Sequence, residues 1–145
     1  MTAAPFFRVR YHRRNRLINI MKALPEIVQT AWLNREGPGV LATVGADGRP
    51  NAVYVNSMRG FGDDTLVIAD NYFHKTRANI LAGSPGALVF LTKERKSYQL
   101  KGRFTYHAAG PVFDDMKTWN PPVHPGVAAA ALKVEQVFCG AEQLR

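Results

Sequence analysis

Residues 40–58 of the chain read VLATVGADGRPNAVYVNSM and set the expected fold. Two runs of mainly apolar residues, 40–44 and 51–58, flank a segment, 45–50, that contains two glycines, an aspartate and a proline. Valine and tyrosine favour extended strands, and the intervening residues are typical of turns. The stretch therefore predicts two consecutive strands joined by a tight turn.

Four more strand-like segments and three helix-like segments accompany this hairpin. The further strands are expected at 65–69, 87–92, 97–107 and 132–138, and the helices from Pro25 toward Gly37, from His74 to Leu81 and from Gly110 to Trp119. The intervening sequence NPPVHPG, residues 120–126, holds three prolines and predicts a rigid loop. Six strands without a repeating strand–helix–strand order predict a mainly β fold, a closed or nearly closed six-stranded antiparallel barrel.

The length and composition fit one globular domain, expected at residues 21–145. Hydrophobic residues make up 46% of the chain and charged residues 21%, close to the average of folded proteins. The chain has one cysteine, Cys139, so no intrachain disulfide can form, and no spaced set of Cys and His predicts a metal site. No apolar run is long enough to cross a bilayer, so no membrane association is expected, and a reducing cytoplasm is the expected location.

The basic character of the chain is concentrated in its first twenty residues. The net charge is +8, and residues 1–20 hold five arginines and no acidic residue. The other residues carry 14 Lys and Arg against 11 Asp and Glu, an ordinary balance that does not predict nucleic-acid binding. Residues 1–20 are expected to be an unstructured basic extension or a stretch upstream of a start at Met21.

The segment with the clearest chemistry is ADNYFHKTRAN, residues 69–79, where a strand end, a loop and a helix start follow one another. The first N–H groups of a helix lack partners within the helix and attract anions. Lys75 adds a positive charge there and Thr76 adds a hydroxyl donor, so a phosphate site is one interpretation. A helix cap with solvated cations is the other. The chain has neither a P-loop nor the GxGxxG dinucleotide motif.

Several of these stretches together resemble a known family. The order VLATV, GADGRPNAVYVNS, DNYFHKTRANI and YQLKGR is similar to the FMN-binding split-barrel proteins related to pyridoxamine 5'-phosphate oxidase, and most similar to the small FMN-binding proteins of that group. The likeness extends from about Glu26 to Leu144. It implies a six-stranded antiparallel split barrel, FMN as the cofactor, and a homodimer with two FMN molecules at the subunit interface.

The resemblance also implies which residues hold FMN. The phosphate is expected at His74, Lys75 and Thr76. The isoalloxazine ring is expected along Tyr54, Val55, Asn56 and Ser57, with Asp70 and Asn71 where the ring meets the ribityl chain. Gln99, with Ser97 as the alternative, is expected to reach the cofactor of its own subunit.

Departures from the family pattern limit the expected activity. Tyr54 stands near the place of a strand arginine in the full oxidases, and the tail AEQLR lacks their substrate-binding pattern, so oxidation of pyridoxamine phosphate is not expected. The resemblance leaves an FMN-dependent oxidoreductase or flavin reductase, which would use a nicotinamide or another small electron donor, with no catalytic residue assigned. A non-catalytic FMN carrier is the alternative, and a haem or deazaflavin binder is a third.

Overall fold

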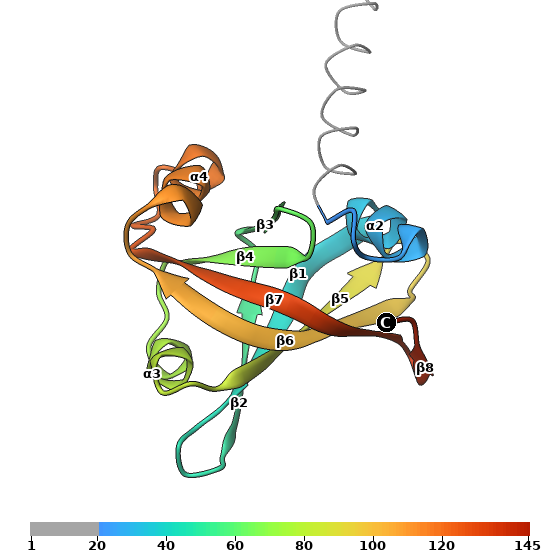
Figure 1. Ribbon diagram of the computed structural model, residues 1–145, viewed down its shortest axis with the longest axis horizontal. Helices are drawn as coiled ribbons and strands as arrows, with labels where there is room; N and C mark the ends of the chain where they lie inside the picture. The colour runs from blue at the N-terminus through green and yellow to red at the C-terminus, as the bar shows by residue number, and fades with distance from the viewer. Residues whose placement is uncertain (1–20) are drawn as a thin grey trace, which may run out of the picture.

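Eight strands and three helices make up residues 21–145, the part of the chain that this computed structural model describes (Figure 1). In chain order they are α2 (Glu26–Leu33), β1 (Arg35–Val44), β2 (Pro50–Val55), β3 (Met58–Phe61), β4 (Thr65–Asp70), α3 (Lys75–Leu81), β5 (Pro85–Thr92), β6 (Ser97–His107), α4 (Pro111–Trp119), β7 (Ala128–Cys139) and β8 (Glu142–Gln143). The basic extension expected at residues 1–20 lies outside the described residues. None of the helices within residues 21–145 is long and apolar enough to span a membrane.

All strands belong to one antiparallel sheet that curls back on itself. The strand order is β2-β1-β5-β6-β7-β4-β3, with β8 added beside β7. β2 and β3 are therefore at opposite edges of the sheet, yet only Asn56 and Ser57 separate them in the chain. Three steps between Cα atoms span at most about 11 Å, so the two edges must approach each other at this point. The predicted mainly β, split-barrel fold is confirmed.

The strand count exceeds six because the expected strand at 51–58 is divided. β2 ends at Val55, and β3 begins at Met58 and pairs with β4, with Met58 opposite Ile68. Gly60 and Phe61 also belong to β3, and the turn to β4 follows at residues 62–64. The expected strand cannot continue because its two halves lie on different edges of the curled sheet. The two-residue strand β8 is the other addition.

The last long strand starts earlier than expected, at Ala128 rather than Leu132. Ala129 and Ala131 pack against Met116 of α4 on one face of β7, while Leu132 packs into the barrel core. Residues 128–132 are buried throughout, so their sequence shows no apolar–polar alternation. Alanine side chains leave room for α4 to lie close to the sheet.

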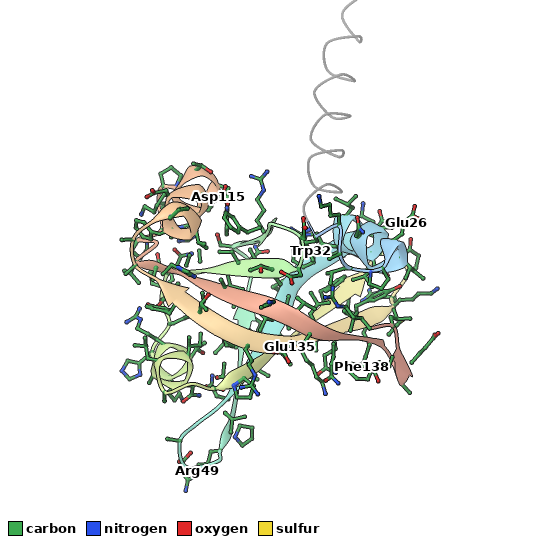
Figure 2. All side chains as sticks on the ribbon, in the orientation of Figure 1. Glu26, Trp32, Arg49, Asp115, Glu135 and Phe138 are labelled. Atoms are coloured by element: carbon green, nitrogen blue, oxygen red, sulfur yellow. The ribbon has the colours of Figure 1, made fainter. Side chains whose placement is uncertain are left out.

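The first strand also differs from its expected bounds. β1 starts at Arg35 and passes through the Gly37-Pro38-Gly39 segment, with a register shift between Glu36 and Val40 against β5. The preceding helix α2 correspondingly ends at Leu33. A bulge allows the strand to absorb residues that pair poorly. The turn between β1 and β2 matches the expectation, and this hairpin extends from the barrel with Arg49 near its tip (Figure 2).

The barrel interior is filled by aliphatic side chains from most strands and is closed at one end by α2. Trp32 of α2 is 2% exposed and contacts Phe90 edge to face, with ring centroids 5.2 Å apart. Phe90 in turn stacks on Tyr98 at 5.5 Å. The other end of the barrel, near α3, carries the polar segment described below.

Gly102 lets β6 bend closely over β7. The register between these strands shifts between Lys101 and Gly102, and a Cβ atom on Gly102 would overlap the backbone carbonyl of Lys133. A backbone atom cannot move aside as a side chain can. The two strands must therefore separate if residue 102 has any side chain.

We expect Gly102→Ala to lower the free energy of unfolding by at least about 2 kcal/mol, because overpacking against backbone disrupts the β6–β7 ladder. Gly83→Ala is the control, since Gly83 has φ +90° and nothing within 4 Å of its added Cβ. Its cost is backbone strain alone, about 1 kcal/mol. Urea denaturation measures both, and a Gly102→Ala protein as stable as the wild type would show that the strands are not in close contact there.

Candidate functional site

A cavity of about 360 Å³ opens between β2, the end of β4 and the start of α3. It is lined by residues 53–57 and 71–76, together with Asn51, Ile68, Ala69 and His124. Ligand pockets commonly have volumes of roughly 300 to 1,000 Å³, so the cavity has the size of a small-molecule site. Eight of the ten residues singled out from the sequence line it: Tyr54, Val55, Asn56, Ser57, Asn71, His74, Lys75 and Thr76.

The segment 71–76 contributes an unbroken wall, because all six of its residues line the cavity. His74 and Lys75 are exposed, whereas Thr76 is only 2% exposed. The segment ends in the first two residues of α3, and this helix has only seven residues, too few for a strong helix dipole. Attraction for an anion must therefore come mainly from the Lys75 charge and the Thr76 hydroxyl.

A polar network behind this wall fixes the Thr76 hydroxyl. Asn51 on β2 donates from Nδ2 to Thr76 Oγ1 at 3.0 Å and to Thr43 Oγ1 at 3.2 Å. Asn79 of α3 donates to the same Thr43 oxygen at 3.0 Å. Since Thr76 Oγ1 already accepts a hydrogen bond, its own proton is free to be donated to a ligand in the cavity.

Sequence reasoning did not single out Asn51, although a signal was present. Thr43 and Asn51 face each other across the β1–β2 hairpin, on the side of the strands that carries Leu41 and Val53. Two polar residues opposite each other at inward positions are unusual in apolar strands. Such a pair of polar residues indicates a polar cluster or a ligand-binding site on the inward side of the hairpin.

Asp70 does not line the cavity, contrary to the expectation that it would meet the ring and ribityl chain. Its side chain is fully buried, and protein donors occupy both carboxylate oxygens. Arg77 donates from Nε to Oδ2 at 2.7 Å and from Nη2 to Oδ1 at 3.0 Å, Tyr106 donates to Oδ2 at 2.6 Å, and the Phe73 N–H donates to Oδ1 at 3.1 Å. The sequence did not reveal these partners, which lie up to 36 residues away.

The same cluster shifts the ionisation of its members. The hydrogen bond to Asp70 raises the pKa of Arg77 above its ordinary value, so the guanidinium stays charged. Burial, and then the hydrogen bond to Asp70, raise the pKa of Tyr106, so its hydroxyl stays protonated and remains a donor. The Arg77 guanidinium and the Tyr106 hydroxyl therefore both keep their protons at any pH near neutrality.

Asn71 and Ser57 line the cavity, but their side chains also anchor another part of the chain. Asn71 and Asn120 exchange two amide hydrogen bonds, at 2.9 and 3.1 Å, and Ser57 donates to Asn120 Oδ1 at 2.6 Å. The Gly126 N–H donates to Asn71 Oδ1 at 3.0 Å. The rigid loop at 120–126 is thereby held against the end of β4.

This anchoring brings His124 into the wall, a residue that sequence reasoning did not assign to the site. His124 Nδ1 lies 3.1 Å from the hydroxyl of Tyr72, and the two rings meet edge to face at 5.6 Å. The two residues are 52 positions apart in the chain, and the bonds from Asn120 and Gly126 to Asn71 help to bring them together. Within residues 21–145, no group of three or more His, Cys, Asp or Glu is placed to hold a metal ion.

Gln99 is the second expected residue that the structure keeps away from this cavity. It lies on β6 and lines a different hollow of about 390 Å³, together with Lys101, Arg103 and Gln136. That hollow is on the outer face of the sheet, where Gln99 stands opposite Val89 and Phe138. Gln99 therefore does not reach the first cavity within its own subunit. The alternative, Ser97, lines neither cavity.

The arrangement suits an elongated ligand with one anionic end. The Thr76 hydroxyl lies beside Asn51, near the start of β2, and Lys75 precedes Thr76 in the chain, while Tyr54 to Ser57 lie at and just beyond the end of β2. Five residues of extended strand span about 16 Å. Val53, Val55 and Ile68 add an apolar surface between these ends, suited to a flat aromatic group.

Comparisons with known proteins agree with this architecture. The family model described as pyridoxamine 5'-phosphate oxidase matches residues 26–139. The structure of HupZ from Group A Streptococcus is 25% identical, with a TM-score of 0.72 over 84% of this chain and 98% of that one. No curated protein sequence matches the chain.

Two other solved structures share the fold at lower identity. A putative pyridoxamine 5'-phosphate oxidase from Lactobacillus delbrueckii is 22% identical, with a TM-score of 0.65, and the likeness covers 76% of this chain and 88% of that one. An FMN-binding protein from Syntrophomonas wolfei is 18% identical, with a TM-score of 0.65 over 99% of this chain and 97% of that one.

Proposed function

The chain belongs to the pyridoxamine 5'-phosphate oxidase family, and from this membership we propose that it is an FMN-binding oxidoreductase. The observation that carries the proposal is the cavity wall at 71–76, where Lys75 and a Thr76 hydroxyl with a free proton stand beside a strand lined with apolar groups. A flavin mononucleotide combines a dianionic phosphate with a flat aromatic ring. Its two ends need these two environments.

The residues assigned to FMN divide by function between the start of α3 and the end of β2. Lys75 and Thr76 hold the phosphate, and His74 stands beside them at the mouth of the cavity. The backbone from Tyr54 to Ser57 lies along the ring. About 16 Å of extended chain separates Asn51, which contacts Thr76, from Asn56. Asp70 is left out of the binding set because protein donors already occupy its oxygens.

Bound FMN would supply hydride and single-electron chemistry, and the protein would orient it and limit access of water. Tyr72 is 72% exposed at the cavity, so this side stays open to a small electron donor or acceptor. We propose a nicotinamide as the donor. The single cysteine of the chain is compatible with a reducing cytoplasm as the location.

We also propose that two copies of the chain pair through the outer face of the sheet. One row across the strands carries Tyr54, Val40, Val89, Gln99 and Phe138, and the next carries Ala52, Ala42, Ala87, Lys101 and Gln136. Val44 and Leu91 on this face are 43% and 39% exposed. A face that exposes several apolar side chains around the polar residues Gln99, Lys101 and Gln136 is typical of an interface. Any contact between Gln99 and FMN would then be made across the dimer.

Lys75→Ala should weaken FMN binding by about one to two orders of magnitude, because a charge-assisted hydrogen bond to phosphate is worth roughly 1.5 to 3 kcal/mol. Riboflavin has the same ring without the phosphate, so its affinity should hardly change. Fluorescence titration measures the affinity of the protein for each ligand. Wild-type protein with bound FMN should absorb at roughly 450 nm. Unchanged FMN affinity in Lys75→Ala would mean that the phosphate lies elsewhere, and a colourless protein that takes up no FMN would remove the proposal.

FMN-loaded protein should oxidise NADH in the presence of a small electron acceptor, at a rate on the order of 1 per second or faster. Free FMN at the same concentration is the control, since it reacts with NADH without the protein. Turnover no faster than that of free FMN would favour the non-catalytic carrier. The absorption spectrum of the isolated protein separately identifies haem or a deazaflavin.

Val89→Glu should convert the dimer to a monomer and weaken FMN binding, because it places a charge in the centre of the outer sheet face. Obligate interfaces bury on the order of 2,000 Å² or more, so the wild type should remain dimeric at micromolar concentration. Ile27→Glu is the matched control, as Ile27 is 54% exposed on α2, away from that face. Light scattering that finds a monomeric wild-type protein with bound FMN would contradict the pairing.

A further inference from the structure

We propose that Asp70 is a positioning residue whose ion pair with Arg77 holds the segment 71–76 in the shape that binds the FMN phosphate. This inference rests on the proposed function and extends it to two residues that do not touch the ligand cavity. Asp70 and Arg77 immediately flank the six consecutive residues that line the cavity, and neither lines it. The carboxylate and the guanidinium join the two ends of the segment.

The Asp70 carboxylate holds the segment 71–76 at its start, in its middle and at its end. Residue 70 is the last residue of β4 and is fixed by the sheet, with Asp70 opposite Ala128 of β7. Oδ1 accepts the backbone N–H of Phe73 at 3.1 Å, within the loop. The two bonds from Arg77, at 2.7 and 3.0 Å, fix the first turn of α3. Only Thr76 separates Lys75 from this anchor.

The geometry makes the pair rigid. Arg77 donates through two nitrogens to two oxygens, which sets the orientation of the guanidinium as well as its distance. Tyr106 donates to Oδ2 at 2.6 Å and ties the pair to β6. The Asp70 side chain is fully buried, so water cannot replace a lost partner easily. A buried carboxylate that loses its cation is strongly disfavoured, and the segment must then rearrange.

A preset segment favours ligand binding, because less conformational entropy is lost when the ligand arrives. Lys75 and His74 are exposed, and no hydrogen bond of their side chains to the described residues holds them in place. Their position therefore depends on the backbone of 71–76. Loss of the Asp70–Arg77 pair should affect binding of the phosphate more than binding of the ring, which lies mainly along β2.

Asp70→Asn tests the inference because it removes the charge and keeps the shape of the side chain. We expect FMN affinity to fall about tenfold and riboflavin affinity to change much less. Arg77→Lys keeps the positive charge but loses the paired hydrogen bonds from two nitrogens. Tyr106→Phe removes only the hydroxyl that donates to Asp70 Oδ2. Both variants should therefore lower FMN affinity by less than Asp70→Asn does. Val28→Ala is the control for general destabilisation, since Val28 is fully buried in α2. It should leave the ratio of FMN to riboflavin affinity unchanged.

Hydrogen–deuterium exchange of the ligand-free proteins gives a second measurement that does not depend on FMN. In Asp70→Asn, amide exchange within 71–77 should rise about tenfold while β5 is unchanged. An exchange rate of residues 71–77 in Asp70→Asn equal to that of the wild type would overturn the inference. Faster exchange together with unaltered FMN affinity would overturn it as well. If the wild type binds no FMN, the proposed function fails, and exchange still decides whether the pair holds the segment. If Asp70→Asn does not fold, the same measurements on Arg77→Lys and Tyr106→Phe decide it.

Discussion

The two-residue connection at Asn56 and Ser57 is the constraint on which the architecture depends. It joins strands that lie at opposite edges of the sheet, and so it forces the sheet to close on itself near these residues. Closure brings the end of β2 beside the end of β4. The Ala69 N–H donates to the Ser57 carbonyl at 2.9 Å across this junction. The cavity lies at this junction, so the fold and the candidate site have one origin.

Three side-chain networks then shape the wall of the cavity. Asp70 and Arg77 hold the segment 71–76, Asn51 orients the Thr76 hydroxyl, and the paired amides of Asn71 and Asn120 bring in the loop that carries His124. The Asn51–Thr76, Asn71–Asn120 and Tyr106–Asp70 bonds join residues that are 25 or more positions apart in the chain. Among the described residues, every buried side-chain nitrogen and oxygen has a hydrogen-bond partner. Buried polar groups that are fully paired favour one arrangement over others, which a preformed binding site requires.

Local patterns in the sequence predicted the elements whose structure is decided locally. The hairpin at 40–58 and the helix after His74 follow from turn residues, β-branched residues and apolar spacing. The division into β2 and β3 was not predictable this way, because the strand-like pattern continues across Asn56 and Ser57 while the sheet edge changes. Ala128 was missed because a strand covered on both faces loses its alternation.

The residues of the candidate site likewise divide into those that local sequence predicted and those that depend on the fold. Residues consecutive in sequence, such as His74, Lys75 and Thr76, were brought together as expected. Asp70 and Gln99 were not, because their surroundings depend on Arg77, on Tyr106 and on the face of β6, none of which local sequence specifies. A side chain at a strand end has the right chemistry for a ligand and for a buried ion pair alike, and only the fold decides between them.

We propose that FMN binds in the cavity at this junction. A crystal structure of the protein grown with FMN tests it directly. The account predicts phosphate oxygens within hydrogen-bonding distance of Thr76 Oγ1 and Lys75 Nζ, with the ring along Tyr54 to Ser57. Well-defined flavin density that is instead confined to the outer sheet face beside Gln99 and Lys101, with the first cavity empty, would contradict it.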